Sequence, residues 1–542
     1  MSTITVFRWQ SRILVPLAFG ALLVAPAMGQ ESPPELARLG KVAFKVECNA
    51  AAQQEFHRAM ALYHSFAWPQ ATESFVAVAE ADPSCGMAHW GRGMTTLGNP
   101  FTWPATLSPT TLNDVSVALD EARAAGLESQ RERDYVDALT SFVRDRDKLD
   151  HKTRLRSFEE AMAKLAASYP DDTEASILSA LMTSASFDPV DKTYANQLRA
   201  AKILEPLFAA QPDHPGVAHY LIHTYDYPLI AKHGVGAARS YAKIAPDAPH
   251  ALHMPSHIFT RLGYWSESIE ANQASAEAAG DATFDGHHAS DYMVYAYLQL
   301  SQDQAARQAM EQSLAKKPID NFGAAYAYAA MPARLALEVA ARKEAASLPL
   351  IPRADAYPWK KYPQAEAVNA FARGVGAAMS GDAATAHAEV ARLHALRDAA
   401  AELKIGYWVE QIDIQAEVVR GLAIWAEGKV DEGVEILKAA TAREDATEKH
   451  VVTPGPLVPA REVLADVLLA AGKTAEALSD YEAVLAKEPN RYRAVLGAAR
   501  AAHSAGDSTK ARAYFAQLLE LGKGADTERD GLREAQQYLD RG

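Results

Sequence analysis

Two stretches near the C-terminus share one pattern and decide the fold: GKTAEALSDYEAVLAKEPN at residues 472–490 and GDSTKARAYFAQLLE at residues 506–520. Each begins with a glycine, has alanine five positions later and an aromatic residue nine positions later: Gly472, Ala477 and Tyr481, then Gly506, Ala511 and Phe515. A small residue lets two helices approach closely, and a ring fills the space beside it. The second stretch follows the first by 34 residues, which is the length of a helix-turn-helix repeat.

Weaker copies of this spacing occur upstream: Gly428, Gly433 and Leu437; Gly381, Ala386 and Val390; Ser301, Ala306 and Met310; Gly263, Ser268 and Asn272; Ala71 and Phe75. The pattern resembles the tetratricopeptide repeat (TPR) family over most of Val46 to Leu521, and most strongly after Pro459. This resemblance implies an all-α fold. We expect a TPR-like α-solenoid of antiparallel helix pairs, coiled as a right-handed superhelix around a concave groove.

Four short segments also resemble a group of exported bacterial TPR proteins whose activity is unsettled: Leu62-Tyr63-His64-Ser65-Phe66, Cys85-Gly86-Met87-Ala88-His89-Trp90-Gly91, His253-Met254-Pro255-Ser256-His257-Ile258-Phe259 and Met331-Pro332-Ala333-Arg334. This second resemblance supports the fold and export. It leaves the chemistry open.

The N-terminus has the pattern of a secretory signal. Arg8 and Arg12 precede an apolar run, and the small residues before Gln30 predict a signal peptide over residues 1–29 with cleavage after Gly29. The apolar run is short for a membrane span, and no cysteine follows the cleavage point to carry a lipid. We therefore expect a periplasmic or secreted protein with no membrane anchor after cleavage.

Proline divides the remaining chain. Residues 348–363 hold four prolines and predict a linker, or a strap packed on the solenoid. The expected organisation is an N-terminal TPR-like lobe over residues 30–347 and a C-terminal TPR lobe over residues 364–542.

Net charge limits the class of partner that suits the chain, and the cysteine content predicts a disulfide. The formal net charge is −14, and loss of the two signal arginines makes it more negative, so nucleic acid is an unsuitable partner. The chain has two cysteines, Cys48 and Cys85, at the outer ends of a predicted helix pair. In an oxidising compartment they predict one disulfide.

Histidine is concentrated between His214 and His288, which hold nine of the seventeen histidines. Within this stretch two sets of residues recur at 34-residue steps: His219, His253 and His287, and His223, His257 and Asp291. Members of a pair four residues apart share one face of a helix. The TPR resemblance implies that such first-helix positions line the concave groove, so we expect six stacked side chains that point inward.

These six side chains predict a metal site, because imidazole and carboxylate together suit ions such as zinc and copper. His250, His288 and Asp226 are possible additional ligands, and two ions are as compatible with the pattern as one. Pro255 lacks an N–H group, so a kink or a helix start is expected between His253 and His257.

Two other functions stay open from the sequence. A metal-free TPR scaffold would bind a peptide, a protein or a small polar ligand in the groove. The two His-x3-His pairs also resemble the ligand spacing of coupled dicopper oxidases and oxygen carriers, which implies a copper-dependent, oxidase-like enzyme. Whether the protein is an enzyme at all is not decided by these motifs.

Overall fold

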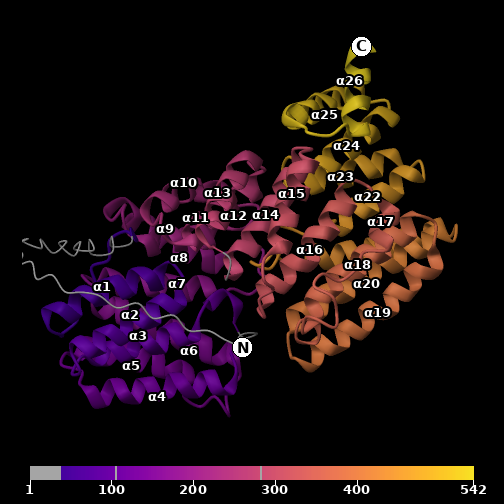
Figure 1. Ribbon diagram of the computed structural model, residues 1–542. Helices are drawn as coiled ribbons and strands as arrows, with labels where there is room; N and C mark the ends of the chain where they lie inside the picture. Colours follow the sequence, from indigo (N-terminus) through magenta and orange to yellow (C-terminus); the bar gives the residue numbers. More distant parts are fainter. Residues whose placement is uncertain (1–37, 104–106, 281–282, 542) are drawn as a thin grey trace, which may run out of the picture. The chain divides into compact units, whose positions relative to one another are not determined.

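The computed structural model describes residues 38–103, 107–280 and 283–541, in which every regular element is helical. The expected signal peptide, residues 1–29, lies outside these residues. Contacts join Arg38–Gly542 into one compact unit, whose helices are drawn in Figure 1.

The first part of the unit consists of α1 (Ala50–His64), α2 (Trp68–Ala81), α3 (Gly86–Leu97), η1 (Pro100–Thr102), α4 (Pro109–Ala125), α5 (Gln130–Val143), α6 (His151–Ser168), α7 (Thr173–Ala185), α8 (Ala195–Ala210), α9 (Pro215–Tyr225), η2 (Ala231–Gly234), α10 (Val235–Ile244), α11 (Pro249–His253), α12 (Pro255–Leu262), α13 (Trp265–Ala278) and α14 (Phe284–Gln299).

The second part consists of α15 (Asp303–Ala315), α16 (Phe322–Glu338), α17 (Arg342–Ala346), η3 (Trp359–Lys361), α18 (Pro363–Met379), α19 (Ala383–Glu402), α20 (Gly406–Ala426), α21 (Val430–Asp445), α22 (Ala460–Ala470), α23 (Thr474–Lys487), α24 (Tyr492–Ser504), α25 (Ser508–Leu521), η4 (Gly522–Gly524) and α26 (Asp530–Arg541).

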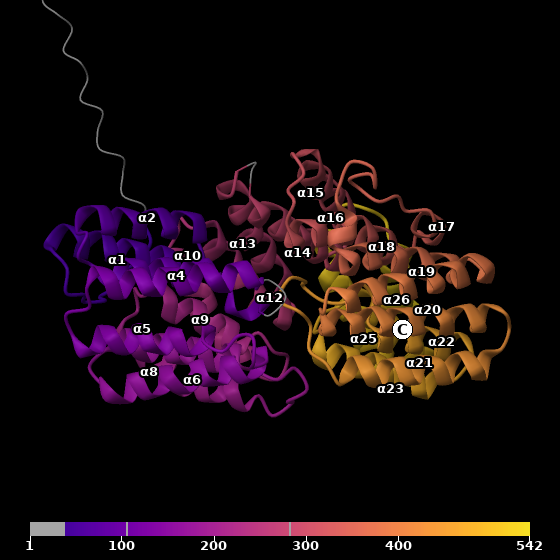
Figure 2. The same ribbon diagram turned by 90° about the horizontal axis from the view of Figure 1, so that it is seen from below.

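Helices that follow one another in the chain pack side by side, for example α18 on α19 and α19 on α20. Alternate helices also touch, as α18 and α20 do, so each hairpin rests on the next (Figure 2). This arrangement is the all-α solenoid that the repeats predicted.

The repeat glycines end helices, as expected. Gly472 follows α22 with φ 77° and Gly506 follows α24 with φ 80°, a left-handed conformation that glycine adopts without a steric penalty. The alanine and the ring that follow are buried, with Ala477 0% and Tyr481 1% exposed. The C-terminal pattern therefore reports packing between helices.

The same contact of a glycine with an aromatic ring occurs in the N-terminal and in the C-terminal helices. A Cβ added to Gly497 in α24 would lie 2.3 Å from the ring of Tyr481 in α23. A Cβ on Gly91 in α3 would lie 2.2 Å from the ring of Phe75 in α2. In both cases the glycine follows the ring by 16 residues, so the N-terminal helices repeat the packing of the C-terminal ones.

The proline-rich segment 348–363 contains only the short helix η3 and lies on its neighbours. Tyr357 is 6% and Trp359 is 3% exposed, and both belong to the hydrophobic cluster formed with α16 and α18. The Tyr357 hydroxyl donates to the carbonyl of Ile319 at 2.7 Å. The segment is thus packed as a strap would be, while a boundary between two lobes at this place stays a prediction.

Two tertiary features bring distant segments of the chain together near the histidines. Helix α9 packs against α1, although the two are distant in sequence. Residues 446–459, between α21 and α22, form a second segment that we call the inner strap. Tyr292 in α14 donates its hydroxyl to the inner-strap carbonyls of Thr453 at 3.0 Å and Val451 at 3.3 Å.

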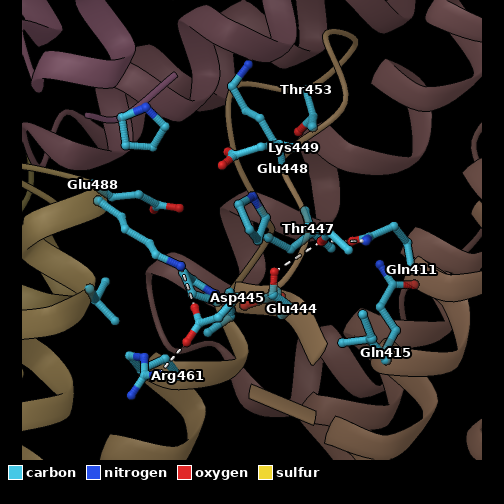
Figure 3. A pocket seen from close by; sticks show the side chains of 18 of the residues that line it. Gln411, Gln415, Glu444, Asp445, Thr447, Glu448, Lys449, Thr453, Arg461 and Glu488 are labelled. Atoms are coloured by element: carbon cyan, nitrogen blue, oxygen red, sulfur yellow. Dashed lines mark hydrogen bonds and ion pairs between the residues drawn. The ribbon is translucent and has the colours of Figure 1, made fainter. Parts of the chain in front are cut away.

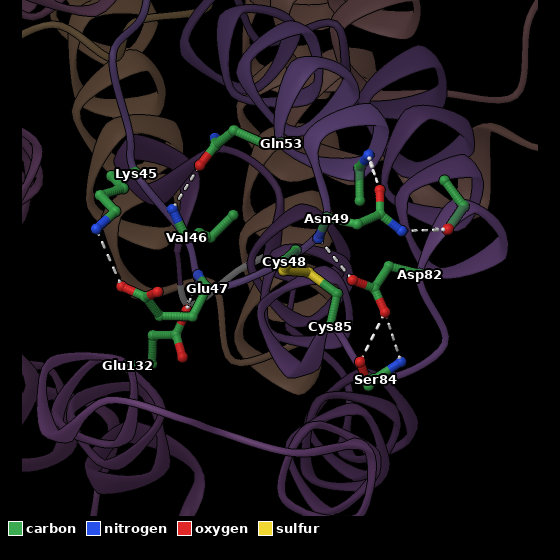
Figure 4. Close-up of a disulfide and its surroundings, with 12 residues drawn as sticks. Lys45, Val46, Glu47, Cys48, Asn49, Gln53, Asp82, Ser84, Cys85 and Glu132 are labelled. Carbon is green, nitrogen blue, oxygen red and sulfur yellow. Dashed lines mark hydrogen bonds and ion pairs between the residues drawn. A yellow bond between two sulfur atoms is a disulfide. The ribbon is translucent and has the colours of Figure 1, made fainter.

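Cys48, just before α1, and Cys85, directly before α3, form a disulfide with 5.2 Å between their Cα atoms (Figure 4). The following Asn49 caps α1 by accepting hydrogen bonds from the N–H groups of Ala51 and Ala52. Asp82 accepts the backbone N–H of Asn49 at 2.7 Å, which holds the two helix ends together beside the sulfur atoms.

Among the helices of the described residues, none has the length and apolar character that crossing a bilayer requires.

Candidate metal centre

Six histidines from four short or medium helices form two adjacent groups. The first contains His219, His223 and His250, and the second contains His253, His257 and His288. In each group, one ligand nitrogen from every histidine lies within 4.8 Å of the others. Across the groups, the ring of His223 lies near that of His257 and the ring of His250 near that of His253, with centroids 6.1 and 6.2 Å apart.

Local structure places the paired histidines. His219 and His223 lie one turn apart in the continuous helix α9, with ring centroids 4.8 Å apart. Pro255 divides the next pair, as expected: His253 ends α11 and His257 lies in α12. Their rings still converge, with centroids 4.9 Å apart.

In the second group, an amide orients His253. Its Nδ1 lies 2.7 Å from Oδ1 of Asn272. The Asn272 Nδ2 atom donates to the carbonyl of Ser268 at 2.7 Å, so its Oδ1 atom is the acceptor facing His253. The Nδ1 atom of His253 therefore carries the ring proton.

A carboxylate orients His257 in the same way. Its Nδ1 lies 2.8 Å from Oδ2 of Asp226. Asp226 is also bound by the guanidinium of Arg261 at 2.8 Å and by the ammonium of Lys449 at 3.1 Å. Although burial raises the pKa of the Asp226 carboxyl, the neighbouring cations hold the pKa well below its usual range, so it is an anion that accepts the His257 proton.

These two bonds leave a pair of lone-pair nitrogens facing each other. The Nε2 atoms of His253 and His257 lie 3.0 Å apart, and both rings have their proton on Nδ1. Burial lowers the pKa of both imidazoles, which keeps them neutral at neutral pH. Two nitrogens bound to one ion at about 2.0–2.1 Å lie about 3 Å apart, so a shared cation would relieve the repulsion.

The first group has an unpartnered nitrogen of its own. His219 Nδ1 donates to the carbonyl of His64 at 2.6 Å, which leaves its Nε2 as an acceptor 3.2 Å from Nε2 of His250. Nε2 of His223 is buried without a hydrogen-bond partner among the described residues. Phe101 stacks on the His223 ring at 4.1 Å and fixes its plane.

A third cluster consists of Glu174, His64 and His214. None of its nitrogen atoms lacks a hydrogen-bond partner. Glu174 accepts from Nε2 of His214 at 2.8 Å and from Nε2 of His64 at 3.1 Å. The other nitrogens accept in turn, His64 from the Tyr220 hydroxyl at 2.8 Å and His214 from the N–H of Val217. Every proton has a place, so this cluster is a complete hydrogen-bonded network that ties α1, α7 and α9 together.

Two expected ligands lie elsewhere. His287 bonds through Nδ1 to Ser313 at 2.9 Å and packs against Tyr328, whereas its neighbour His288 joins the second group. Asp291 is held in a buried ion pair with Arg334 at 2.7 Å. The prediction of two stacked rows was therefore wrong for the third residue of each row, His287 and Asp291.

His287 and His288 are consecutive residues of α14, so their side chains point about 100° apart, and His288 lies on the side of α14 that meets the second group. The left-handed residue that ends α12 is Gly263, and the one after α14 is Ser301, with φ 57°, which lies 38 residues later. A 34-residue step from His253 therefore falls one helical turn short of the equivalent position. Of the additional candidates, His250 and His288 join the groups, and Asp226 contacts one of them as an orienting group.

Asn272, Glu174 and Lys449 also belong to this region, and spacing alone did not reveal them as site residues. Asn272 was visible only as a repeat position. Lys449 is separated from Asp226 by 223 residues, so no local pattern connects the two.

The two groups are closed to large molecules. The histidine side chains are buried, and the most accessible one, His250, is 13% exposed.

Comparison with known proteins agrees with the repeat assignment. A sequence model of the tetratricopeptide repeat matches residues 463–526. The crystal structure of the TPR domain of P58(IPK) is similar at 11% identity over 91% of this chain and 99% of that chain, but with a TM-score of only 0.22. No curated protein matches the sequence.

The helix pairs define the class of protein as an α-solenoid. Within that class, the sequence model identifies tetratricopeptide repeats over residues 463–526.

Proposed function

We propose that this protein is an exported TPR protein that binds one transition-metal ion in each of the two three-histidine groups. The observation that carries the proposal is the pair of facing Nε2 lone pairs of His253 and His257, 3.0 Å apart. Neutral imidazole ligands suit zinc and copper, and three protein ligands leave a coordination position for water or a small ligand.

The surroundings support the same proposal. Metal-binding histidines usually donate their second N–H to a carboxylate, an amide or a carbonyl. Here His257 has Asp226, His253 has Asn272 and His219 has the His64 carbonyl as such acceptors. The Cys48–Cys85 disulfide supports export, because structural disulfides persist in oxidising compartments.

Metal analysis of the purified mature chain tests this function. After reconstitution with zinc or copper, we expect two ions per chain. His257→Ala and His219→Ala should each remove one of the two ions, because they lie in different groups. His387→Ala is the matched control, since His387 is exposed and bonded to Glu427 on the surface.

A wild-type chain with less than about a tenth of an equivalent after reconstitution would contradict the proposal. The protein would then be a metal-free TPR scaffold, which binds a peptide, a protein or a small polar ligand.

The second candidate is a copper-dependent, oxidase-like enzyme. It is favoured by the short separation of the groups, 6.1 Å between the His223 and His257 rings, because this could bring two ions close enough to share a small ligand. Magnetic coupling between two bound copper ions, seen as loss of their paramagnetic resonance signal, would support this candidate. Two independent copper signals would exclude a coupled pair.

A further inference from the structure

A cavity of 460 Å³ lies beside the inner strap and is lined by residues of α16, α18, α20, α21 and α23 (Figure 3). This volume is within the range of about 300–1,000 Å³ that is typical of small-molecule sites. Aromatic rings of Tyr326, Phe371, Tyr407 and Trp408 form part of the wall. The cavity is separate from the histidine groups, which contribute no residue to its lining.

Every cation in the cavity wall already has a carboxylate partner. The pairs are Lys192 with Glu448, Arg261 and Lys449 with Asp226, and Arg461 and Lys487 with Asp445. Arg461 also pairs with Asp480, whereas Arg261 and Lys449 share the one carboxylate of Asp226.

Two carboxyl groups of the wall are not matched in this way. Glu444 accepts one hydrogen bond, from the N–H of Ala460 at 2.8 Å, and within the described part of the chain it forms no ion pair. In Figure 3 it lies between Glu488 on one side and Gln411 and Gln415 on the other.

Glu488 is the third carboxylate around a single guanidinium. It lies 3.8 Å from Arg491, whereas Glu338 and Glu462 lie closer to that arginine, at 2.7 and 2.6 Å. The Glu488 carboxylate also accepts the Tyr295 hydroxyl at 3.2 Å. Arg493 also pairs with Glu462 at 2.9 Å and with Asp466 at 2.8 Å, so four carboxylates, Glu338, Glu462, Asp466 and Glu488, share two guanidinium groups on this side of the cavity.

A third acceptor belongs to another residue of the same wall. Oε1 of Gln415, another lining residue, is buried with no hydrogen-bond partner in the described chain. Burial, together with the nearby Glu488 and Asp445 charges and against the opposing charge of Lys487, raises the pKa of Glu444 to about 8. The wall thus contains a buried acid, a surplus carboxylate and an unpartnered amide oxygen. A hydrogen-bond donor with positive charge would satisfy these groups.

We propose that this cavity binds a small organic amine in its ammonium form. Glu444 and Glu488 bind the ammonium group, and the rings of Tyr326, Tyr407 and Trp408 contact its apolar body. An ammonium supplies three donors and no acceptor, which matches the surplus of acceptors. Aromatic rings add attraction for a cation through their negative faces.

Calorimetric titration of the full chain with butylamine, hexylamine and phenethylamine tests the proposal. Butanol, hexanol and phenethyl alcohol are matched neutral ligands. We expect at least one amine to bind at least about tenfold more tightly than its alcohol. Glu444→Gln should weaken that binding about tenfold, because the amide keeps the shape but cannot give up a proton to form an ion pair with the ammonium group. Glu435→Gln, on the exposed face of the same helix, should leave it unchanged.

Equal binding of amine and alcohol, or no binding of any of the three amines at millimolar concentration, would overturn the proposal. So would wild-type affinity in Glu444→Gln. Circular dichroism shows whether that variant folds, and Glu488→Gln supplies the same test if it does not. Metal content does not enter this experiment, so its outcome is distinct from that of the metal analysis.

Discussion

At the scale of single residues, hydrogen bonds distinguish two kinds of histidine cluster. Two clusters contain nitrogen lone pairs without a donor in the described part of the chain, and in the third every nitrogen has a partner. The cluster of His64, Glu174 and His214 has a donor for each acceptor. The pair His253 and His257 has two protons directed outward and two lone pairs directed at each other. Both clusters are buried, and they differ in the placement of their protons, because Glu174 accepts a proton from each of its two histidines.

Asp226 is the residue on which the second group depends. Its carboxylate contacts His257, Arg261 and Lys449, and the side chains of the two cations are 9% and 5% exposed. Replacing Asp226 with asparagine leaves both cations buried without their counter-charge. We expect a loss of about 3–5 kcal/mol in the free energy of unfolding, measured in urea.

The matched control for this change is Asp120→Asn, whose side chain is 81% exposed and pairs with Arg123. An exposed pair of this kind contributes about 0–1 kcal/mol. If the two variants had the same stability, the account of Asp226 as a buried counter-charge would be wrong.

Glu444 should make stability depend on pH. Its pKa is raised from 4.5 to about 8 in the folded chain, so between these values the folded chain keeps a proton that the unfolded chain has lost. Raising the pH across this interval therefore lowers the free energy of unfolding. Glu444→Gln mimics the protonated acid and lacks this loss. The stability of the variant relative to wild type should rise from about pH 5 to pH 8; a constant difference would contradict the shifted pKa.

At the scale of helices, the ends of each element decide which side chains meet. Pro255 separates α11 from α12, and α14 is a turn longer than the repeat spacing predicts. Within α14, His288 and not its neighbour His287 reaches the second group. A difference of one residue turns a helical side chain by about 100°, since a turn holds about 3.6 residues.

Helix pairs depend on close approach at glycine. We expect Gly497→Ala to destabilise the protein by about 1–3 kcal/mol, because the added carbon would meet the buried ring of Tyr481. Thermal or urea unfolding measures this change.

Gly406→Ala is the control at a helical glycine with open space, where nothing lies within 4 Å of the added carbon. It should not destabilise the protein, since alanine favours the helix over glycine. Equal losses at both positions would show that the contact with Tyr481 is unimportant.

At the scale of the whole molecule, the inner strap connects helices that are distant in sequence. Arg334 in α16 binds Asp291 in α14 and donates to Oγ1 of Thr453 and to the carbonyl of Gly455. Lys449 of the same strap reaches Asp226. The strap therefore links the candidate metal centre to the C-terminal repeats.

Removing Arg334 should loosen this connection. Arg334→Ala leaves Asp291, which is 1% exposed, without a partner, and we expect a loss of about 3–5 kcal/mol in the free energy of unfolding. Hydrogen exchange in residues 446–459 should become faster than in wild type. Arg353→Ala, which removes a pair that is 83% and 67% exposed, should change neither quantity. Unchanged exchange in Arg334→Ala would show that other contacts hold the strap.

Much of the fold was predictable from the sequence because helix ends and helix packing leave local signals. Gly472 and Gly506 mark left-handed turns, and Ala477 and Tyr481 mark a contact between neighbouring helices. The approach of Cys48 to Cys85 also followed from a helix pair. Four of the six predicted metal ligands, His219, His223, His253 and His257, lie in the two groups. Their spacing within and between neighbouring helices is also a local signal.

The sequence by itself determined that the chain forms helical repeats and that its histidines gather on a few successive helices. Only the tertiary structure decided which three histidines form each group, which protons point outward and which cations surround Asp226. A fixed spacing predicts equivalent positions only when successive repeats have equal length. The repeat that ends with α14 is about one helical turn longer than 34 residues. Contacts such as that of Lys449 with Asp226 depend on how distant segments fold together, which no local pattern records.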